Sequence, residues 1–84
     1  MLVRLYTTLG CHLCEDALVL LREYELASAI ALELDQIEIS DSDVLMQKYG
    51  IRIPVVQIAA NEAELGWPFN LLELAKFLDH NSLL

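Results

Sequence analysis

Two cysteines, Cys11 and Cys14, are the residues of this chain whose type and spacing most directly permit chemistry. They are the only thiols in the sequence, and two residues separate them. Such a pair can exchange disulfides, because the thiolate of one cysteine attacks a disulfide and the second thiol resolves the mixed disulfide. A disulfide across so short a loop would constrain the unfolded chain little. The spacing therefore predicts redox chemistry rather than a structural crosslink.

A metal site and a pair of buried, inert cysteines are the two alternatives for this motif. A zinc site takes four ligands, of which C-x-x-C supplies two. The only histidines are His12, inside the motif, and His80, near the other end of the chain, so we expect no metal site. Lone cysteines are commonly buried and unreactive. Two at this spacing, at the start of a helix, favour redox chemistry instead.

The cysteines fall between a predicted strand and a predicted helix. Residues 2–6 have the β-favouring pattern of a short strand, and residues 7–10 form a loop. A helix is predicted from residue 11 or 12 to about residue 28, because apolar residues recur at three- and four-residue steps. Its expected buried stripe consists of Leu13, Ala17, Leu20, Leu21, Tyr24 and Ala27.

This arrangement places Cys11 at the amino end of the helix. Unsatisfied backbone N–H groups and the helix dipole favour a thiolate at that position. We therefore expect Cys11 to be the nucleophile and the more acidic of the two thiols. Cys14 lies about one turn further along the same face, within reach of Cys11, and is the expected resolving thiol.

The next segment predicts a second strand and a short helix. Residues 32–39 contain alternating apolar positions, with a slip at residues 35–36. The Ser and Asp residues at positions 40–43 are typical of a helix start and predict a short helix that ends at Tyr49. Gly50 is expected to end this helix in a left-handed conformation.

The last third of the chain predicts two more strands and a final helix. Residues 55–58 and 63–65 are the predicted strands, with a turn between them. Asn70, with Glu73 three residues later, resembles a capping box and predicts a helix to about residue 79.

The element order predicts an α/β fold with the sequence β-α-β-α-β-β-α. The first strand–helix–strand unit requires a parallel pair and a right-handed crossover, and the last two strands form an antiparallel hairpin. The result is a four-stranded mixed sheet with helices on both faces. Since 84 residues leave room for one domain, we predict a single domain over residues 1–84.

The composition predicts a folded protein outside the membrane. Hydrophobic residues make up 56% of the chain, and its mean hydropathy is +0.44, which argues against disorder. No apolar stretch approaches the ~20 residues of a membrane-spanning helix. The first residues lack a basic leader followed by a long apolar region, so we expect no secretory signal and a cytoplasmic location.

The charge balance restricts the expected partners. Thirteen acidic residues against five basic ones give a formal net charge of −8. A face that binds nucleic acid or an anionic membrane needs an excess of cations. We therefore expect neither nucleic acid nor a membrane as a partner, and we expect the chain to be a monomer.

Two segments of the sequence together resemble the glutaredoxin-like proteins of the thioredoxin fold. Residues 6–14 read YTTLGCHLC and continue as Glu15-Asp16-Ala17, and residues 50–56 read GIRIPVV. The two segments occur in the order and at the spacing of that family, and the resemblance covers nearly the whole chain. It implies a thioredoxin-like fold and a thiol–disulfide oxidoreductase.

The resemblance also implies residues that bind the substrate. In the family, the proline that matches Pro54 follows a cis peptide bond and lies opposite the cysteine pair, and the backbone of the residue before it, here Ile53, pairs with bound peptide or glutathione. His12 is a candidate to tune the thiolate or to cap the helix. Trp67 is either a packing residue or a substrate contact at the rim of the site.

The sequence departs from typical glutaredoxins in two places that concern glutathione. The loop at residues 7–10 has no lysine before the motif, and His12-Leu13 replaces Pro-Tyr between the cysteines. Residues 64–68 contain one glycine, where the family has Gly-Gly and an acidic residue. We expect a disulfide-containing protein or glutathione as the partner and no bound cofactor, with glutathione left open as a co-substrate.

Two other functions are compatible with the same fold. Some relatives hold an iron–sulfur cluster between two chains, so an iron–sulfur or metal carrier is one alternative. A non-catalytic binding module that retains the thioredoxin fold is the other.

Overall fold

The computed structural model describes residues 1–82, so the last two residues of the predicted domain lie outside the described residues. The predicted order of strands and helices is confirmed. The elements are β1 (Leu2–Thr7), α1 (His12–Ser28), β2 (Glu33–Glu38), a 3₁₀ turn (Ile39–Asp41), α2 (Asp43–Tyr49), β3 (Val55–Ile58), β4 (Glu64–Gly66) and α3 (Leu71–Ser82). Within residues 1–82, no helix is both long and apolar enough to cross a membrane.

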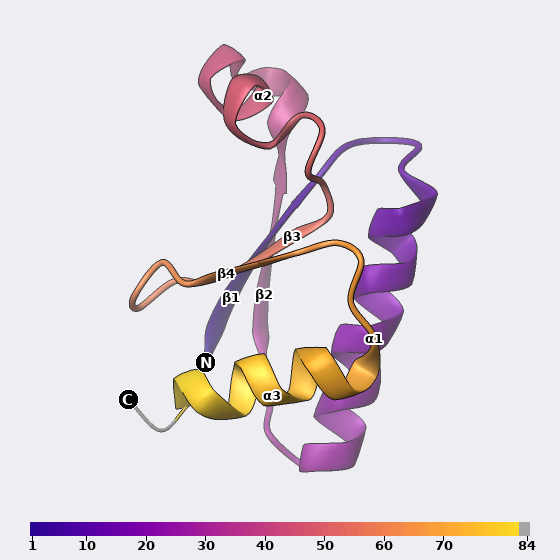
Figure 1. Cartoon of the computed structure of the whole chain (residues 1–84), viewed down its shortest axis with the longest axis vertical. Coiled ribbons are helices and arrows are strands. Elements are labelled where there is room, and N and C mark those ends of the chain that lie inside the picture. The colour runs from indigo at the N-terminus through magenta and orange to yellow at the C-terminus, as the bar shows by residue number, and fades with distance from the viewer. Residues whose placement is uncertain (83–84) are drawn as a thin grey trace.

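The four strands form one mixed sheet in the order β2-β1-β3-β4. Strand β1 pairs in parallel with β2 and antiparallel with β3, and β3 pairs antiparallel with β4. In this register Thr7 lies opposite Glu38, and Tyr6 lies opposite Val55. The end of β1 that leads to the cysteines therefore lies between the end of β2 and the start of β3. Figure 1 shows the loop between β1 and α1 at the same end of the molecule as helix α2.

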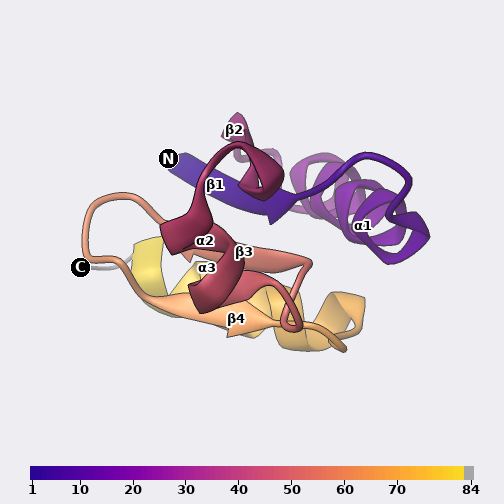
Figure 2. The same ribbon diagram turned by 90° about the horizontal axis from the view of Figure 1, so that it is seen from above.

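Helices cover both faces of the sheet, as the sequence predicts. On one face, residues of β1 and β3 pack with residues of α1 and α3 in the main core, which includes Val3, Leu5, Val56, Leu21, Leu74 and Leu78. On the opposite face, Tyr49 at the end of α2 packs with Tyr6, Ile39 and Val55. Figure 2, seen from above, shows α2 nearest the viewer, over the end of the sheet.

The buried stripe of α1 differs from the predicted one at both ends. Ala17, Leu21 and Tyr24 are buried as predicted, but Leu13 is 47% exposed and Ala27 is also exposed. Cys14 takes the place of Leu13 at the start of the stripe and is 4% exposed. The prediction was wrong there because Leu13 and Cys14 are both apolar neighbours, so periodicity alone leaves the phase of the stripe ambiguous by one residue.

Helix α2 ends at Tyr49 as predicted, but Gly50 does not adopt the predicted left-handed conformation. Its φ and ψ angles are −50° and −40°, and its N–H donates to the Met46 carbonyl at 2.8 Å. Gly50 thus continues the helical path for one residue, and a Cβ at this position would collide with the Met46 carbonyl oxygen. The left-handed helix end occurs at Ala29 instead, with φ of 59°, after α1.

The C-terminal elements follow the prediction with small shifts. Strand β4 begins and ends one residue later than predicted, and α3 continues past residue 79 to Ser82. The capping box is confirmed: the Glu73 N–H donates to Asn70 Oδ1 at 2.8 Å, and the Asn70 N–H donates to Glu73 Oε1 at 3.1 Å. These reciprocal bonds satisfy two donors at the start of α3.

Candidate redox site

The two cysteines are joined by a disulfide at the start of α1. Cys11 is the N-cap residue, with φ of −82° and ψ of 101°, and the two Cα atoms lie 5.2 Å apart. The Cys14 backbone N–H donates to Cys11 Sγ at 3.1 Å. The first sulfur therefore occupies the position where a capping side chain accepts a helix N–H. This geometry supports a redox role for the pair.

The two sulfur-bearing residues differ in their access to solvent. Cys11 is partly exposed, whereas Cys14 is 4% exposed and begins the buried stripe of α1. An incoming disulfide can approach the side chain of Cys11 more readily than that of Cys14. The assignment of Cys11 as nucleophile and Cys14 as resolving thiol remains a prediction, and this difference in exposure agrees with it.

The loop between β1 and α1, which we call the redox loop (residues 8–10), has little packing of its own. The Leu9 side chain is 92% exposed. Gly10 has a φ of 80°, a backbone conformation that a residue without a Cβ adopts readily. Within the loop, the Cys11 N–H donates to the Thr8 carbonyl at 3.3 Å. The position of the loop therefore depends largely on its hydrogen bonds.

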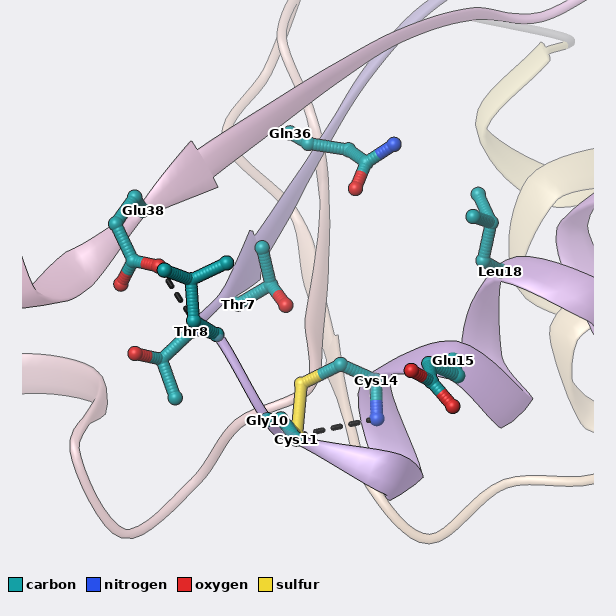
Figure 3. A pocket seen from close by; sticks show the side chains of 10 residues that line it. Thr7, Thr8, Gly10, Cys11, Cys14, Glu15, Leu18, Gln36 and Glu38 are labelled. Atoms are coloured by element: carbon teal, nitrogen blue, oxygen red, sulfur yellow. Dashed lines mark hydrogen bonds between the residues drawn. A yellow bond between two sulfur atoms is a disulfide. The ribbon is translucent and has the colours of Figure 1, made fainter.

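A cavity of about 190 Å³ lies beside the disulfide, between the redox loop, the first turns of α1 and strand β2. Figure 3 shows the side chains around it. Its lining is mixed, with polar groups that include Thr7, Thr8, Glu15, Gln36 and Glu38 next to the two cysteines. Of these, Gln36 and Glu38 come from the edge strand of the sheet, far along the sequence from the cysteines.

The predicted substrate-binding residues of the Pro54 segment lie at the same end of the sheet. The Ile53–Pro54 peptide bond is cis, and Pro54 is fully buried. The Trp67 N–H donates to the Pro54 carbonyl at 3.1 Å, so Trp67 and Pro54 are neighbours. Ile53, Pro54 and Trp67 do not line the cavity. Because β3 and β2 flank β1 on opposite sides, these residues and the cavity lie on two different sides of the redox loop.

His12 and Trp67, the two further candidates, have other contacts in the structure. The His12 side chain is 92% exposed, and its Nδ1 lies 3.7 Å from Glu15 Oε2. An exposed pair of this kind contributes little to stability. The Trp67 ring packs edge-to-face against Phe69, with 5.0 Å between the ring centroids, and is half-buried.

The structure offers no obvious metal ligand set in the part of the chain that it describes. Among residues 1–82, no group of three or more His, Cys, Asp and Glu side chains is arranged to hold a metal ion.

A polar network supports the sheet on the face opposite the main core. The Tyr6 and Tyr49 rings stack with 4.0 Å between their centroids. The Tyr6 hydroxyl donates to Gln57 Oε1 at 2.9 Å, and the Tyr49 hydroxyl donates to Glu64 Oε2. Burial, together with the hydrogen bond to Glu64, raises the pKa of Tyr49 above its usual value. Tyr6 is thus held by its stacking on Tyr49 and its hydrogen bond to Gln57, close to the point where β1 leads into the redox loop.

Glu38 is a site residue that the sequence did not identify. Its carboxylate accepts hydrogen bonds from the backbone N–H groups of Leu9 and Ser40, at 2.9 and 3.0 Å. The hydrogen bond from Ser40, followed by one from the Thr8 side chain, lowers the pKa of Glu38 to about 2. The parallel pairing of two predicted strands was the available signal, because it places the ends of both strands side by side.

The comparisons with known proteins agree with this architecture. The family described as Glutaredoxin-like domain (DUF836) matches residues 2–79. The X-ray structure of Northeast Structural Genomics target protein XcR50 from X. campestris is 32% identical, with a TM-score of 0.82, over 93% of this chain and 96% of that chain. The solution structure of the same target is 34% identical, with a TM-score of 0.77, over 95% of each chain.

A more distant similarity concerns the fold alone. Thioredoxin 1 from the thermophilic eubacterium Thermosipho africanus TCF52B is 16% identical to this chain. Its TM-score is 0.62, over 96% of this chain and 93% of that chain. No curated protein matches the sequence. The predicted thioredoxin-like fold is confirmed by the structural similarity.

Proposed function

This chain belongs to the glutaredoxin-like domain family, and from that premise we propose that it is a thiol–disulfide oxidoreductase for protein or small-molecule disulfides. One observation carries the proposal. The Cys11–Cys14 disulfide lies at the amino end of α1, with Cys11 partly exposed and Cys14 buried. A stabilised, accessible thiolate next to a second thiol is the arrangement that dithiol exchange requires.

The proposed reaction begins with both cysteines reduced. The Cys11 thiolate attacks one sulfur of a substrate disulfide, so that a Cys11–substrate disulfide forms and the other substrate sulfur leaves as a thiolate. Cys14 then loses its proton and attacks the Cys11 sulfur. The Cys11–Cys14 disulfide forms, and the second substrate sulfur leaves as a thiolate. Two electrons pass from the protein to the substrate, and an external thiol or dithiol returns the protein to the reduced state.

We also propose roles for the helix end and for the residues around the cysteine pair. The amino end of α1 stabilises negative charge on Cys11, and the Cys14 N–H, 3.1 Å from Cys11 Sγ, adds a direct donor. We assign Ile53 and Pro54 to substrate docking, because they directly precede β3, whose first residue, Val55, pairs with Tyr6 near the end of β1. Trp67 adjoins Pro54 and is a candidate contact at the edge of that segment.

Intact mass and free-thiol content across a series of glutathione redox poises test the proposal. We expect the Cys11–Cys14 disulfide to form and break reversibly within the cytosolic range, and a Cys11→Ser variant to lose exchange. A stable mixed disulfide with glutathione at Cys11 would identify glutathione as the partner of the same chemistry. Two thiols that stay unchanged at every poise, or full exchange activity in the Cys11→Ser variant, would contradict the proposal.

A further inference from the structure

Glu38 connects the redox loop to the far end of strand β2. It is the last residue of β2 and lies opposite Thr7 in the sheet. Its Oε1 accepts the Leu9 N–H at 2.9 Å, and its Oε2 accepts the Ser40 N–H at 3.0 Å. One carboxylate thus holds two backbone segments that are distant in sequence. Figure 3 shows it beside the loop and lining the same cavity as the disulfide.

The Leu9 bond matters because the redox loop has few other means of keeping its position. The Leu9 side chain is 92% exposed and provides no packing, and Gly10 has no side chain to pack. The Cys11 N–H bond to Thr8, at 3.3 Å, closes the loop upon itself without tying it to the rest of the protein. The Glu38 carboxylate supplies a bond from the loop to the sheet.

We propose that Glu38 is a positioning residue for Cys11: its carboxylate holds the redox loop so that the Cys11 sulfur stays at the N-cap of α1 in the dithiol form. This inference rests on the proposed dithiol function. Glu38 acts on Cys11 through the redox loop, by its hydrogen bonds from the Leu9 backbone N–H and the Thr8 side chain. Its hydrogen bonds to Ser40 and Thr8 lower its pKa to about 2, so the carboxylate is ionised, and a strong acceptor, at neutral pH.

The two redox forms depend on this contact to different degrees. In the disulfide form, the Cys11–Cys14 bond itself fixes Cys11 next to α1. In the dithiol form that covalent tie is broken, and the hydrogen bonds of the loop keep Cys11 at the helix end. Removing the Glu38 acceptor therefore penalises the dithiol form selectively and shifts the equilibrium toward the disulfide.

The loss of negative charge alone acts in the opposite direction. A carboxylate near a thiolate disfavours the thiolate, so removing its charge favours the dithiol form. Glu38→Ala and Glu38→Gln both remove the charge, but only Gln keeps a carbonyl oxygen, which can accept from Leu9 while the NH2 group replaces the acceptor of Ser40. The difference between these two variants therefore isolates the acceptor from the charge.

The test is the equilibrium constant of the Cys11–Cys14 couple against glutathione, for wild type and each variant. We expect Glu38→Ala to favour the disulfide about fivefold relative to Glu38→Gln. A single hydrogen bond contributes about 1 kcal/mol net, which corresponds to about fivefold in an equilibrium constant. Amide hydrogen exchange at Leu9 in the reduced protein should be faster in the Ala variant. Glu33→Ala is the matched control, because Glu33 is an exposed acidic residue at the other end of β2, and it should leave both readouts unchanged.

Two further results separate the possible failures. If the wild-type cysteines do not interconvert, the proposed function fails. If they do, but the Ala and Gln variants have equal equilibrium constants, the positioning role alone is overturned. Glu38→Asp keeps the charge but shortens the side chain, so the Asp variant should also favour the disulfide relative to wild type. It replaces the Ala variant in the test if the Ala variant does not fold. An Asp variant identical to wild type would equally contradict the role.

Discussion

Cys11 and Cys14 are bonded to each other, yet they occupy different environments because of how α1 is oriented. Cys11 lies before the first turn, where its sulfur accepts the Cys14 N–H. Cys14 is within the first turn and faces the core, with 4% of its surface exposed. Two residues three positions apart thus differ in exposure, with Cys11 partly exposed and Cys14 buried, although both line the cavity. The proposed division into attack and resolution follows from this difference.

A Cys14→Ser variant tests that division at the level of single atoms. Without the second thiol, the mixed disulfide formed by Cys11 has no internal nucleophile to resolve it. We expect this variant to accumulate a covalent adduct with a small disulfide substrate, at one adduct per chain by intact mass. The Cys11→Ser variant should form no such adduct under the same conditions. Adduct on Cys14 in the Cys11→Ser variant would instead reverse the two roles.

The sequence identified the cysteine pair of the candidate site but not every residue that contacts the loop beside it. The spacing of Cys11 and Cys14 has a chemical meaning that needs no fold. The proposed role of Glu38 depends on the register of two strands, and its contact with Leu9 spans 29 residues of sequence. His12 is adjacent to the pair in sequence, but in the structure its side chain is 92% exposed and next to Glu15. Proximity in sequence gave no indication of Glu38, and the roles expected for His12 stay predictions.

At the level of elements, local signals predicted the capping hydrogen bonds at helix starts better than the backbone conformation that follows a helix end. Ser42 and the pair Asn70 and Glu73 cap α2 and α3 through contacts between residues three apart, so the sequence contains the whole interaction. The conformation of Gly50 depends instead on the path of the chain toward β3. Glycine permits a left-handed conformation without requiring it, and here the backbone continues in the right-handed one.

Removing the cap of α3 should lower the stability of the protein. In Asn70→Ala, the Glu73 N–H loses its acceptor, and we expect a loss of about 1 kcal/mol in the free energy of unfolding. Asn70→Asp is the control, because Asp keeps a side-chain oxygen at the N-cap. Urea denaturation of the three proteins measures the effect. Equal midpoints for the Ala variant and wild type would show that this cap does not limit stability.

At the level of the whole molecule, one main core joins the sheet to α1 and α3. Leu21, at 0% exposure, lies within that core, whereas Leu26, on the same helix, is 86% exposed. The same chemical change at these two positions therefore separates core packing from the intrinsic preferences of the helix. A protein of this size has little stability to lose, since folded domains are stable by only about 5 to 15 kcal/mol.

Leu21→Ala should lower the free energy of unfolding by about 3 kcal/mol, through lost burial and the cavity left behind. Leu26→Ala should change it by less than about 0.5 kcal/mol, because the side chain it shortens is already in solvent. Thermal and urea denaturation, with the cysteines oxidised in both variants, measure the difference. A loss of similar size at both positions would contradict the packing of α1 described above.

The position of Trp67 determines what the tryptophan fluorescence of the protein reports. It is the only tryptophan in the chain. Its ring packs edge-to-face against buried Phe69, and its backbone N–H donates a hydrogen bond to the Pro54 carbonyl. All indole fluorescence therefore comes from a single ring at the junction between β4 and α3, beside the segment that is proposed to receive the substrate. Its emission reports on that junction without an added label, in a spectrum with one tryptophan to assign.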